Sequence, residues 1–139
     1  MIYPRPSALD SCDLDGVQIT FTEIHHVIDA FYGKVQLDSQ LKIPFGSVED
    51  WNHHVDRLTH FWWIRLGGRP YQEGMYNPVE KHFRAGFNPA FLSRWLDLFH
   101  QTLIELLKPE AAERWFEIVS MMGQALSFKN EQYSAYRNR

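Results

Sequence analysis

The sequence predicts a single all-α domain, and three observations support this fold class. The 139 residues are the length of one domain. Apolar residues recur at helical spacing along four long stretches, and no stretch alternates convincingly as a strand would. Capping and breaking residues stand where those stretches begin and end. We therefore expect four substantial helices and several short ones.

The pattern divides the chain into three parts. Residues 1–18 contain two prolines, several aspartates and little periodicity, which indicates an irregular N-terminal arm. Residues 19–128 carry the helical pattern and form the predicted domain. Residues 129–139 are polar and are expected to form a fraying C-terminal tail.

The first predicted helix starts near Thr20. Thr20 and Glu23 have the spacing of a capping box, in which each side chain bonds to the backbone N–H of the other residue. Pro44 and Gly46 predict a tight corner after the helix, with Phe45 between them. The apolar residues of the helix share one face, and they are Ile24, Val27, Ile28, Phe31, Tyr32 and Val35.

The second predicted helix begins after Ser47, which can cap it, and ends at Gly67 and Gly68. A loop covers residues 69–78, and a short helical piece that begins at Pro78 carries His82. The inner face of the second helix comprises Trp51, His54, Val55, Leu58, Phe61, Trp62 and Arg65.

Two more long helices complete the predicted domain. Asn88 as a cap and Pro89 at the first helical position open the third, which runs to about Leu107. Pro109 opens the fourth. Both helices have apolar faces with large rings, including Trp95, Phe99, Trp115 and Phe116.

Charge and composition exclude several classes of function. The net charge is −3 and no stretch is densely basic, so nucleic acid is not an expected partner. The single cysteine, Cys12, lies in the predicted arm, excludes an intrachain disulfide and fits a reducing compartment. No apolar run approaches the roughly 18 residues of a membrane span, and the start lacks the order of a signal peptide. We expect a soluble, cytoplasmic protein without a membrane partner.

Two of the seven histidines differ from the rest. His54 lies on an apolar helix face, where its ring needs a polar partner, and a backbone carbonyl is the ordinary one. His82 lies on a short segment that can be directed into a pocket, although a surface position is the ordinary alternative. The histidines on polar helix faces, such as His25, His53, His60 and His100, are expected to be solvated.

Zinc and nucleophilic catalysis have little support in the sequence. Zinc needs three or four ligands at characteristic spacing, and neither HExxH nor paired cysteines occur. No nucleophile elbow is present, and no glycine-rich loop can cradle phosphate.

A haem site uses the residues that remain. Haem iron takes one neutral imidazole and needs apolar and aromatic walls around a flat ring. His82 can supply the imidazole, and Tyr32, His54 and Trp95 carry polar groups for a bound ligand. The candidate walls are Phe31, Phe45, Leu58, Trp62 and Phe83.

Four blocks of the sequence resemble the truncated haemoglobins, and most closely their third, mainly bacterial subgroup. They are AFYGKV at 30–35, EDWNHHVDRLTHFWW at 49–63, EKHF at 80–83 and FLSRWLDLF at 91–99. The resemblance runs from about residue 20 to residue 128 without a large gap. The glycine pairs of other subgroups are missing at the start, and Gly67-Gly68 echoes them only in part.

The resemblance implies a shortened globin fold, a helical sandwich around haem b (iron protoporphyrin IX). It makes His82 the proximal iron ligand, Tyr32 and Trp95 the distal residues that contact the ligand, and His54 a distal or gate residue. It places Phe45 against the haem, with Leu58 and Trp62 following His54 over it.

Two hydrogen-bond donors imply slow release of dioxygen, which suits a carrier poorly. We therefore expect redox chemistry: nitric oxide oxidation by dioxygen, or reduction of peroxide or peroxynitrite. The expected ligands are dioxygen, carbon monoxide, nitric oxide or peroxide, with an unidentified reductase as electron donor. The alternatives are an oxygen store or sensor without turnover, and a helical interaction protein whose aromatics only form a core.

Overall fold

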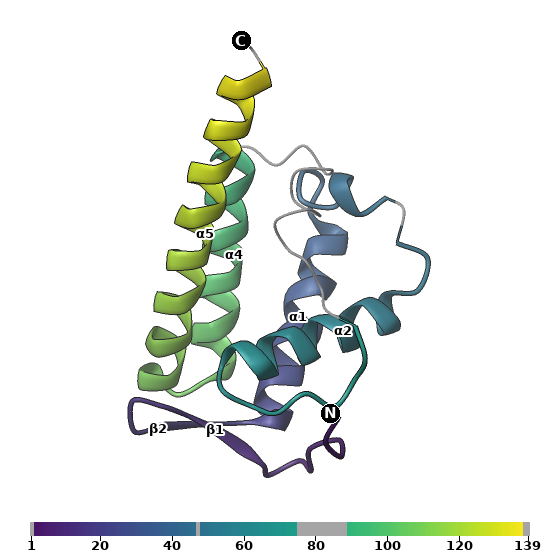
Figure 1. The fold of residues 1–139 in the computed structure, drawn as a ribbon, viewed down its shortest axis with the longest axis vertical. Helices are drawn as coiled ribbons and strands as arrows, with labels where there is room; N and C mark the ends of the chain where they lie inside the picture. The colour runs from purple at the N-terminus through teal and green to yellow at the C-terminus, as the bar shows by residue number, and fades with distance from the viewer. Residues whose placement is uncertain (1, 47, 75–88, 138–139) are drawn as a thin grey trace.

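The computed structural model describes residues 2–46, 48–74 and 89–137, with side chains up to residue 125 in the last helix. Its elements, in chain order, are strands β1 (Ser11–Leu14) and β2 (Val17–Thr20), helix α1 (Phe21–Leu37), the 3₁₀ helix η1 (Ile43–Phe45), and helices α2 (Trp51–Arg65), α4 (Pro89–Leu106) and α5 (Pro109–Arg137) (Figure 1).

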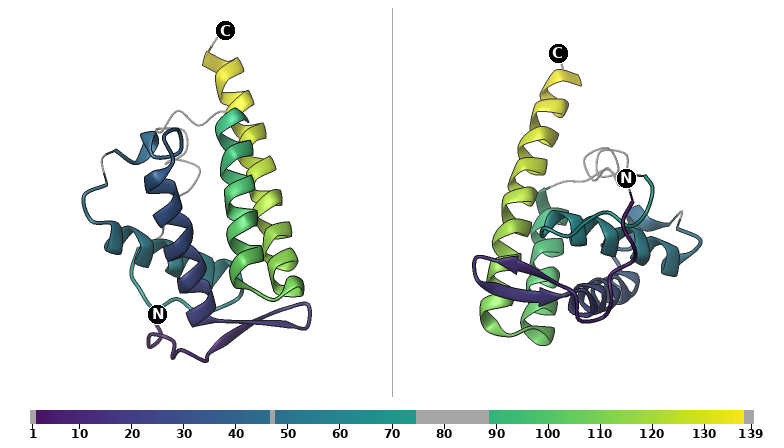
Figure 2. Two further views of the ribbon diagram at one scale, coloured as in Figure 1. Left: turned by 180° about the vertical axis from the view of Figure 1, so that it is seen from behind. Right: turned by 60° about the horizontal axis from the view of Figure 1, so that its bottom comes forward.

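The four long helices make one packed unit. Helices α4 and α5 form an antiparallel pair, α1 packs against α4, and α2 crosses α1 (Figures 1 and 2). The β-hairpin runs beneath the lower ends of α1 and α5 and contacts both helices. The predicted number and order of long helices are therefore confirmed.

Helix α1 begins as its sequence predicts. The Thr20 hydroxyl accepts from Glu23 N at 3.1 Å, and Thr20 N donates to the Glu23 carboxylate at 2.9 Å. This capping box satisfies two backbone donors that the first turn would otherwise leave open. The predicted stripe is buried along the whole helix, and Phe21 joins it.

The predicted irregular arm is wrong for residues 11–18, which form most of an antiparallel hairpin. Asp15 and Gly16 both have positive φ, at 52° and 85°, as a two-residue turn between twisted strands requires. Cys12 pairs with Ile19 in register, and both side chains are buried in the core. Hydrophobic burial on one face therefore holds the hairpin against the helices.

Burial also changes the chemistry of Cys12. Its Sγ lies 3.8 Å from the carbonyl oxygen of Trp63, and removal from water raises the pKa of the thiol to about 11. Cys12 is therefore a protonated core residue rather than part of an unstructured arm.

Two helix ends differ from the predictions. The side chain of Asp50 accepts from His53 N at 3.1 Å, so Asp50 caps α2. Ser47, the predicted cap, lies outside the described residues. Helix α5 continues to Arg137, so the polar tail predicted from residue 129 is helical over most of its length.

Gly68 is expected to be the least replaceable glycine after α2. A Cβ at this position would overlap the indole ring of Trp63. That ring is fixed, because its Nε1 donates to Arg69 O at 3.1 Å and the ring packs perpendicular to Phe21 at 5.3 Å between centroids. Gly68→Ala should destabilise the fold by about 1–3 kcal/mol through overpacking.

The matched control is Gly33→Ala on α1, where an added Cβ meets nothing within 4 Å. This change should stabilise the fold by about 0.5–1 kcal/mol, because alanine loses less backbone entropy in a helix. Thermal unfolding of both variants tests the packing at Gly68, and equal melting temperatures would contradict it.

Candidate functional site

One cluster of rings brings together three of the predicted site residues. The Tyr32 ring on α1 and the His54 ring on α2 have centroids 5.3 Å apart and meet at 89°. The Phe45 ring from η1 lies 5.8 Å from both of these rings. Trp51, at the start of α2, completes the cluster at 5.5 Å from His54. Tyr32 is buried, whereas His54 is half-buried.

A second cluster contains the predicted residues Phe31, Trp62 and Trp95. Trp95 stacks on Phe99 at 5.1 Å with an interplanar angle of 20°, and Phe31 meets both rings edge-on. Trp62 from α2 lies 5.8 Å from Phe99. Rings from α1, α2 and α4 therefore form a continuous aromatic wall.

Phe31 joins the two clusters. Its ring centroid lies 4.9 Å from that of Tyr32 and 5.1 Å from that of Trp95. Tyr32 and Trp95 thus share one neighbour and lie in the same region. Leu58 is 3% exposed and lies one turn after His54 and one turn before Trp62 on α2.

The wall contains a buried donor that sequence analysis missed. The Trp115 ring on α5 is fully buried, 5.7 Å from both Trp62 and Phe99. Its Nε1 has no hydrogen-bond partner in the part of the chain that the structure describes. A buried N–H left without an acceptor costs about 1–3 kcal/mol, and an acceptor on a group bound against this wall would remove that cost.

These residues fit a haem group in their chemistry. The described rings supply the apolar walls that a porphyrin needs, and Tyr32, His54 and Trp95 supply polar atoms beside them. The predicted ligand His82 and the predicted wall residue Phe83 lie outside the described residues.

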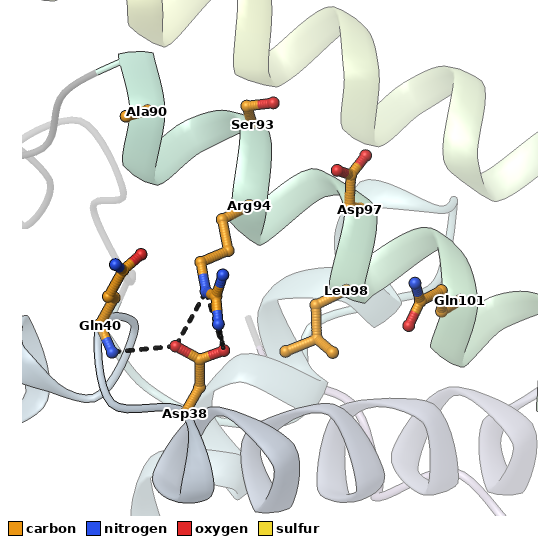
Figure 3. Close-up of a pocket in the computed structure, with 8 residues that line it drawn as sticks. All are labelled: Asp38, Gln40, Ala90, Ser93, Arg94, Asp97, Leu98 and Gln101. Atoms are coloured by element: carbon orange, nitrogen blue, oxygen red, sulfur yellow. Dashed lines mark hydrogen bonds and ion pairs between the residues drawn. The ribbon is translucent and has the colours of Figure 1, made fainter.

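Ion pairs fix the spacing between the helices that carry Tyr32 and Trp95. The Arg94 guanidinium on α4 holds Asp38, the cap of α1, with Nε 3.0 and 2.9 Å from the two carboxylate oxygens (Figure 3). This hydrogen-bonded pair lowers the pKa of Asp38 to about 2. Earlier on α1 and later on α4, Lys34 Nζ lies 2.8 Å from Glu105 and 3.1 Å from Thr102.

An open groove of 580 Å³ runs along α4, and the Asp38–Arg94 pair forms part of its lining (Figure 3). Among the described residues that line it, most are polar, and Leu98 and Ala90 are apolar. A flat hydrophobic group needs apolar walls, so the aromatic clusters are the better candidate site. The residues lining the groove are Asp38, Gln40, Ala90, Ser93, Arg94, Asp97, Leu98 and Gln101.

The prediction that His60 is solvated is wrong. Its side chain is 5% exposed, and its Nε2 accepts from Tyr71 N at 3.1 Å and Gln72 N at 3.3 Å. The helical pattern could not show this, because the cover over His60 is a loop rather than another helix. The sequence held one sign of this burial: His60 lies between Thr59 and Phe61, near the end of a helix rich in tryptophan.

The described residues show neither of two other site types. Within residues 2–46, 48–74 and 89–137, no three His, Cys, Asp or Glu side chains gather as a metal-binding group. No helix in the same ranges combines the length and apolar character that crossing a membrane requires.

Comparisons with known proteins bear on the family and the fold. A family model described as bacterial-like globin matches residues 16–128. The structure is similar to the crystal structure of a group III truncated haemoglobin from Campylobacter jejuni, with a TM-score of 0.71 and 25% sequence identity. The similarity covers 83% of this chain and 94% of the other. A search of curated proteins found no match.

Proposed function

The chain belongs to the bacterial-like globin family, and from this premise we propose that it is a haem protein that carries out redox chemistry on small ligands. Family membership implies haem-based binding of small ligands. The predicted shortened globin fold and the resemblance to third-group truncated haemoglobins are both confirmed. The redox role, rather than storage, is our proposal.

We assign the cofactor as haem b and His82 as its axial ligand. Phe31, Phe45 and Trp62 would form walls, together with Leu58 and Phe83. The iron would supply reversible binding of diatomic ligands and a site for electron transfer. An unidentified reductase would return electrons, and we place the protein in the cytoplasm.

The observation that carries the redox proposal is the contact between Tyr32 and His54. It places a phenol and an imidazole 5.3 Å apart, ring to ring, at the same end of the aromatic wall. A phenolic hydroxyl donates a hydrogen bond, and an imidazole can accept or deliver a proton near neutral pH. These groups can polarise a small oxygen-containing ligand and hold a proton beside it.

Two turnover assays on the haem-loaded chain test this function. With a reducing system present, we expect catalytic consumption of nitric oxide under dioxygen, or of hydrogen peroxide without it. The Tyr32→Phe variant should be slower, because it keeps the ring and lacks the hydroxyl. Normal ligand binding without either turnover would contradict the redox role and favour storage or sensing.

We propose that His54 acts as a gate. Its residue is half-buried, and its ring lies beside those of Tyr32 and Phe45, two of the proposed site residues. His54→Leu should therefore change the association rate of carbon monoxide, by roughly tenfold if the ring controls about 1.4 kcal/mol of the entry barrier. Stopped-flow mixing measures this rate.

The neighbouring His53→Leu is the matched control, since His53 is exposed on the same helix. It should leave carbon monoxide association unchanged. A His54 variant with normal association but much faster dioxygen release would show that His54 binds the ligand directly instead.

A further inference from the structure

The loop that follows α2 is held on one side by the N-terminal segment. Tyr3 N donates to Pro70 O at 2.8 Å, and the Arg69 guanidinium lies 4.9 Å from the Tyr3 ring centroid. Arg5 lies over the Tyr71 ring at 5.4 Å. Residues 3–5 therefore cover residues 69–71.

Side chains of α2 and α1 also contact the same loop. Trp63 Nε1 donates to Arg69 O at 3.1 Å, and the Tyr71 ring meets the Phe21 ring edge-on at 5.6 Å. The His60 ring meets Tyr71 at 4.6 Å. We call residues 69–72 the post-α2 loop.

His60 makes two hydrogen bonds to this loop through a single atom. Its Nε2 accepts from Tyr71 N at 3.1 Å and Gln72 N at 3.3 Å, and the side chain is 5% exposed. Only an unprotonated ring nitrogen can accept, so the ring must be neutral with its proton on Nδ1. A proton on Nε2 would face two N–H donors in a buried position and break both bonds.

The position of the loop in the chain gives these bonds a function. Gln72 precedes His82 by ten residues. Ten residues span at most about 33–36 Å when fully extended. Fixing residue 72 therefore bounds the region that His82 can reach.

We propose that His60 is a positioning residue for haem binding: its neutral ring anchors the post-α2 loop, and protonation of that ring releases the loop. This inference rests on the proposed function for its consequence on haem. The anchoring itself depends only on described contacts.

The other charged and titratable groups near His60 interact with Tyr71 and Thr59, which lie beside it. Asp56 on α2 and Arg5 in the N-terminal segment both act on the Tyr71 hydroxyl, whose pKa burial raises to about 12. His25 on α1 contacts Thr59. Tyr71 is therefore uncharged near neutral pH.

The pH dependence follows from the burial of His60. Burial lowers its pKa, because the charged ring loses its hydration. When the loop is open, the ring regains an ordinary pKa of about 6.5. The anchor is therefore at full strength above about pH 6.5 and weakens as the pH falls below that value. One proton is involved, so the opening equilibrium can rise by at most about tenfold per pH unit.

Hydrogen exchange of the Tyr71 and Gln72 amides tests the anchor directly in the full-length chain. Protection factors, which correct for the intrinsic pH dependence of exchange, should fall below pH 6.5 in the wild type. His60→Gln keeps an acceptor oxygen near the position of Nε2 but cannot titrate. Its protection should stay flat with pH, and the control His53→Gln should behave as the wild type. Parallel curves for the wild type and His60→Gln would overturn the proposal.

A measurement on the wild type covers the case in which His60→Gln does not fold. The ¹⁵N chemical shift of His60 Nε2 should report an unprotonated acceptor at neutral pH. Its protonation should follow the same curve as the loss of amide protection. Protection that is lost while Nε2 remains unprotonated would overturn the proposal.

The rate of haem loss to an excess of apomyoglobin tests the positioning role. Acid will also protonate His82, but this effect is common to all variants. Below pH 6.5 the wild type should lose haem faster than His60→Gln, by up to about tenfold per pH unit. Equal acceleration would overturn the positioning role. A chain that binds no haem but shows the predicted exchange pattern would defeat the proposed function alone.

Discussion

Replacing His82 with alanine should abolish tight haem binding. A single imidazole is the axial ligand in the proposed site, and its removal leaves the iron without a protein bond. We expect haem loss to accelerate by at least about 100-fold, which corresponds to about 2.8 kcal/mol at 1.4 kcal/mol per tenfold. The Soret absorption and the rate of haem transfer to an acceptor protein measure this change.

Two controls make the result specific to the ligand. His82→Gly with free imidazole should regain the wild-type spectrum, because the small base can occupy the space of the lost ring. His53→Ala, an exposed histidine, should keep haem normally. Unchanged haem affinity in His82→Ala would refute the assignment. Acid should also release haem from the wild type, since a proton competes with iron for the same nitrogen.

Removing the polar groups of Tyr32 and Trp95 should speed dioxygen release. Tyr32→Phe deletes only the hydroxyl, and Trp95→Phe keeps an aromatic ring stacked near Phe99 while removing the indole N–H. If each donor contributes about 1.5–3 kcal/mol, release should accelerate by roughly 10- to 150-fold. Flash photolysis or stopped-flow displacement measures these rates.

Two further measurements show whether the faster release comes from a lost hydrogen-bond network or from altered packing. They are dioxygen release in the double variant and carbon monoxide release in all variants. Because Tyr32 and Trp95 both contact Phe31, we expect less than the product of the single effects in the double variant. Carbon monoxide is a poorer acceptor, so its release should change much less. Equal acceleration for both gases would indicate altered packing, and strict additivity would indicate separate contacts.

The long helices could be predicted because their signals are local. Thr20 and Glu23 form the capping box that their spacing predicts, and α4 and α5 begin at Pro89 and Pro109. Periodic apolar residues then require a partner surface, which places the helices in one core. The hairpin also had a local signal, Asp15-Gly16, but its strands are only four residues each and their alternation is weak.

The candidate site could be predicted only in part. Tyr32, His54 and Phe45 come from three elements, and the sequence alone gives no distance between them; their resemblance to a family's motif brought them together. His60 and Cys12 were misjudged for one reason. His60 is covered by a loop, and Cys12 lies in a hairpin strand and contacts Trp63 on α2, so helical periodicity carries no information about the burial of either residue.

Titration of the haem-free chain with haem is the most direct test of the central claim. Trp62, Trp95 and Trp115 belong to the aromatic wall, so bound haem should quench their fluorescence strongly. Our account predicts that quenching and a Soret band rise together and saturate at one haem per chain. Quenching that rises without saturation, or a Soret band that remains that of free haem, would contradict it.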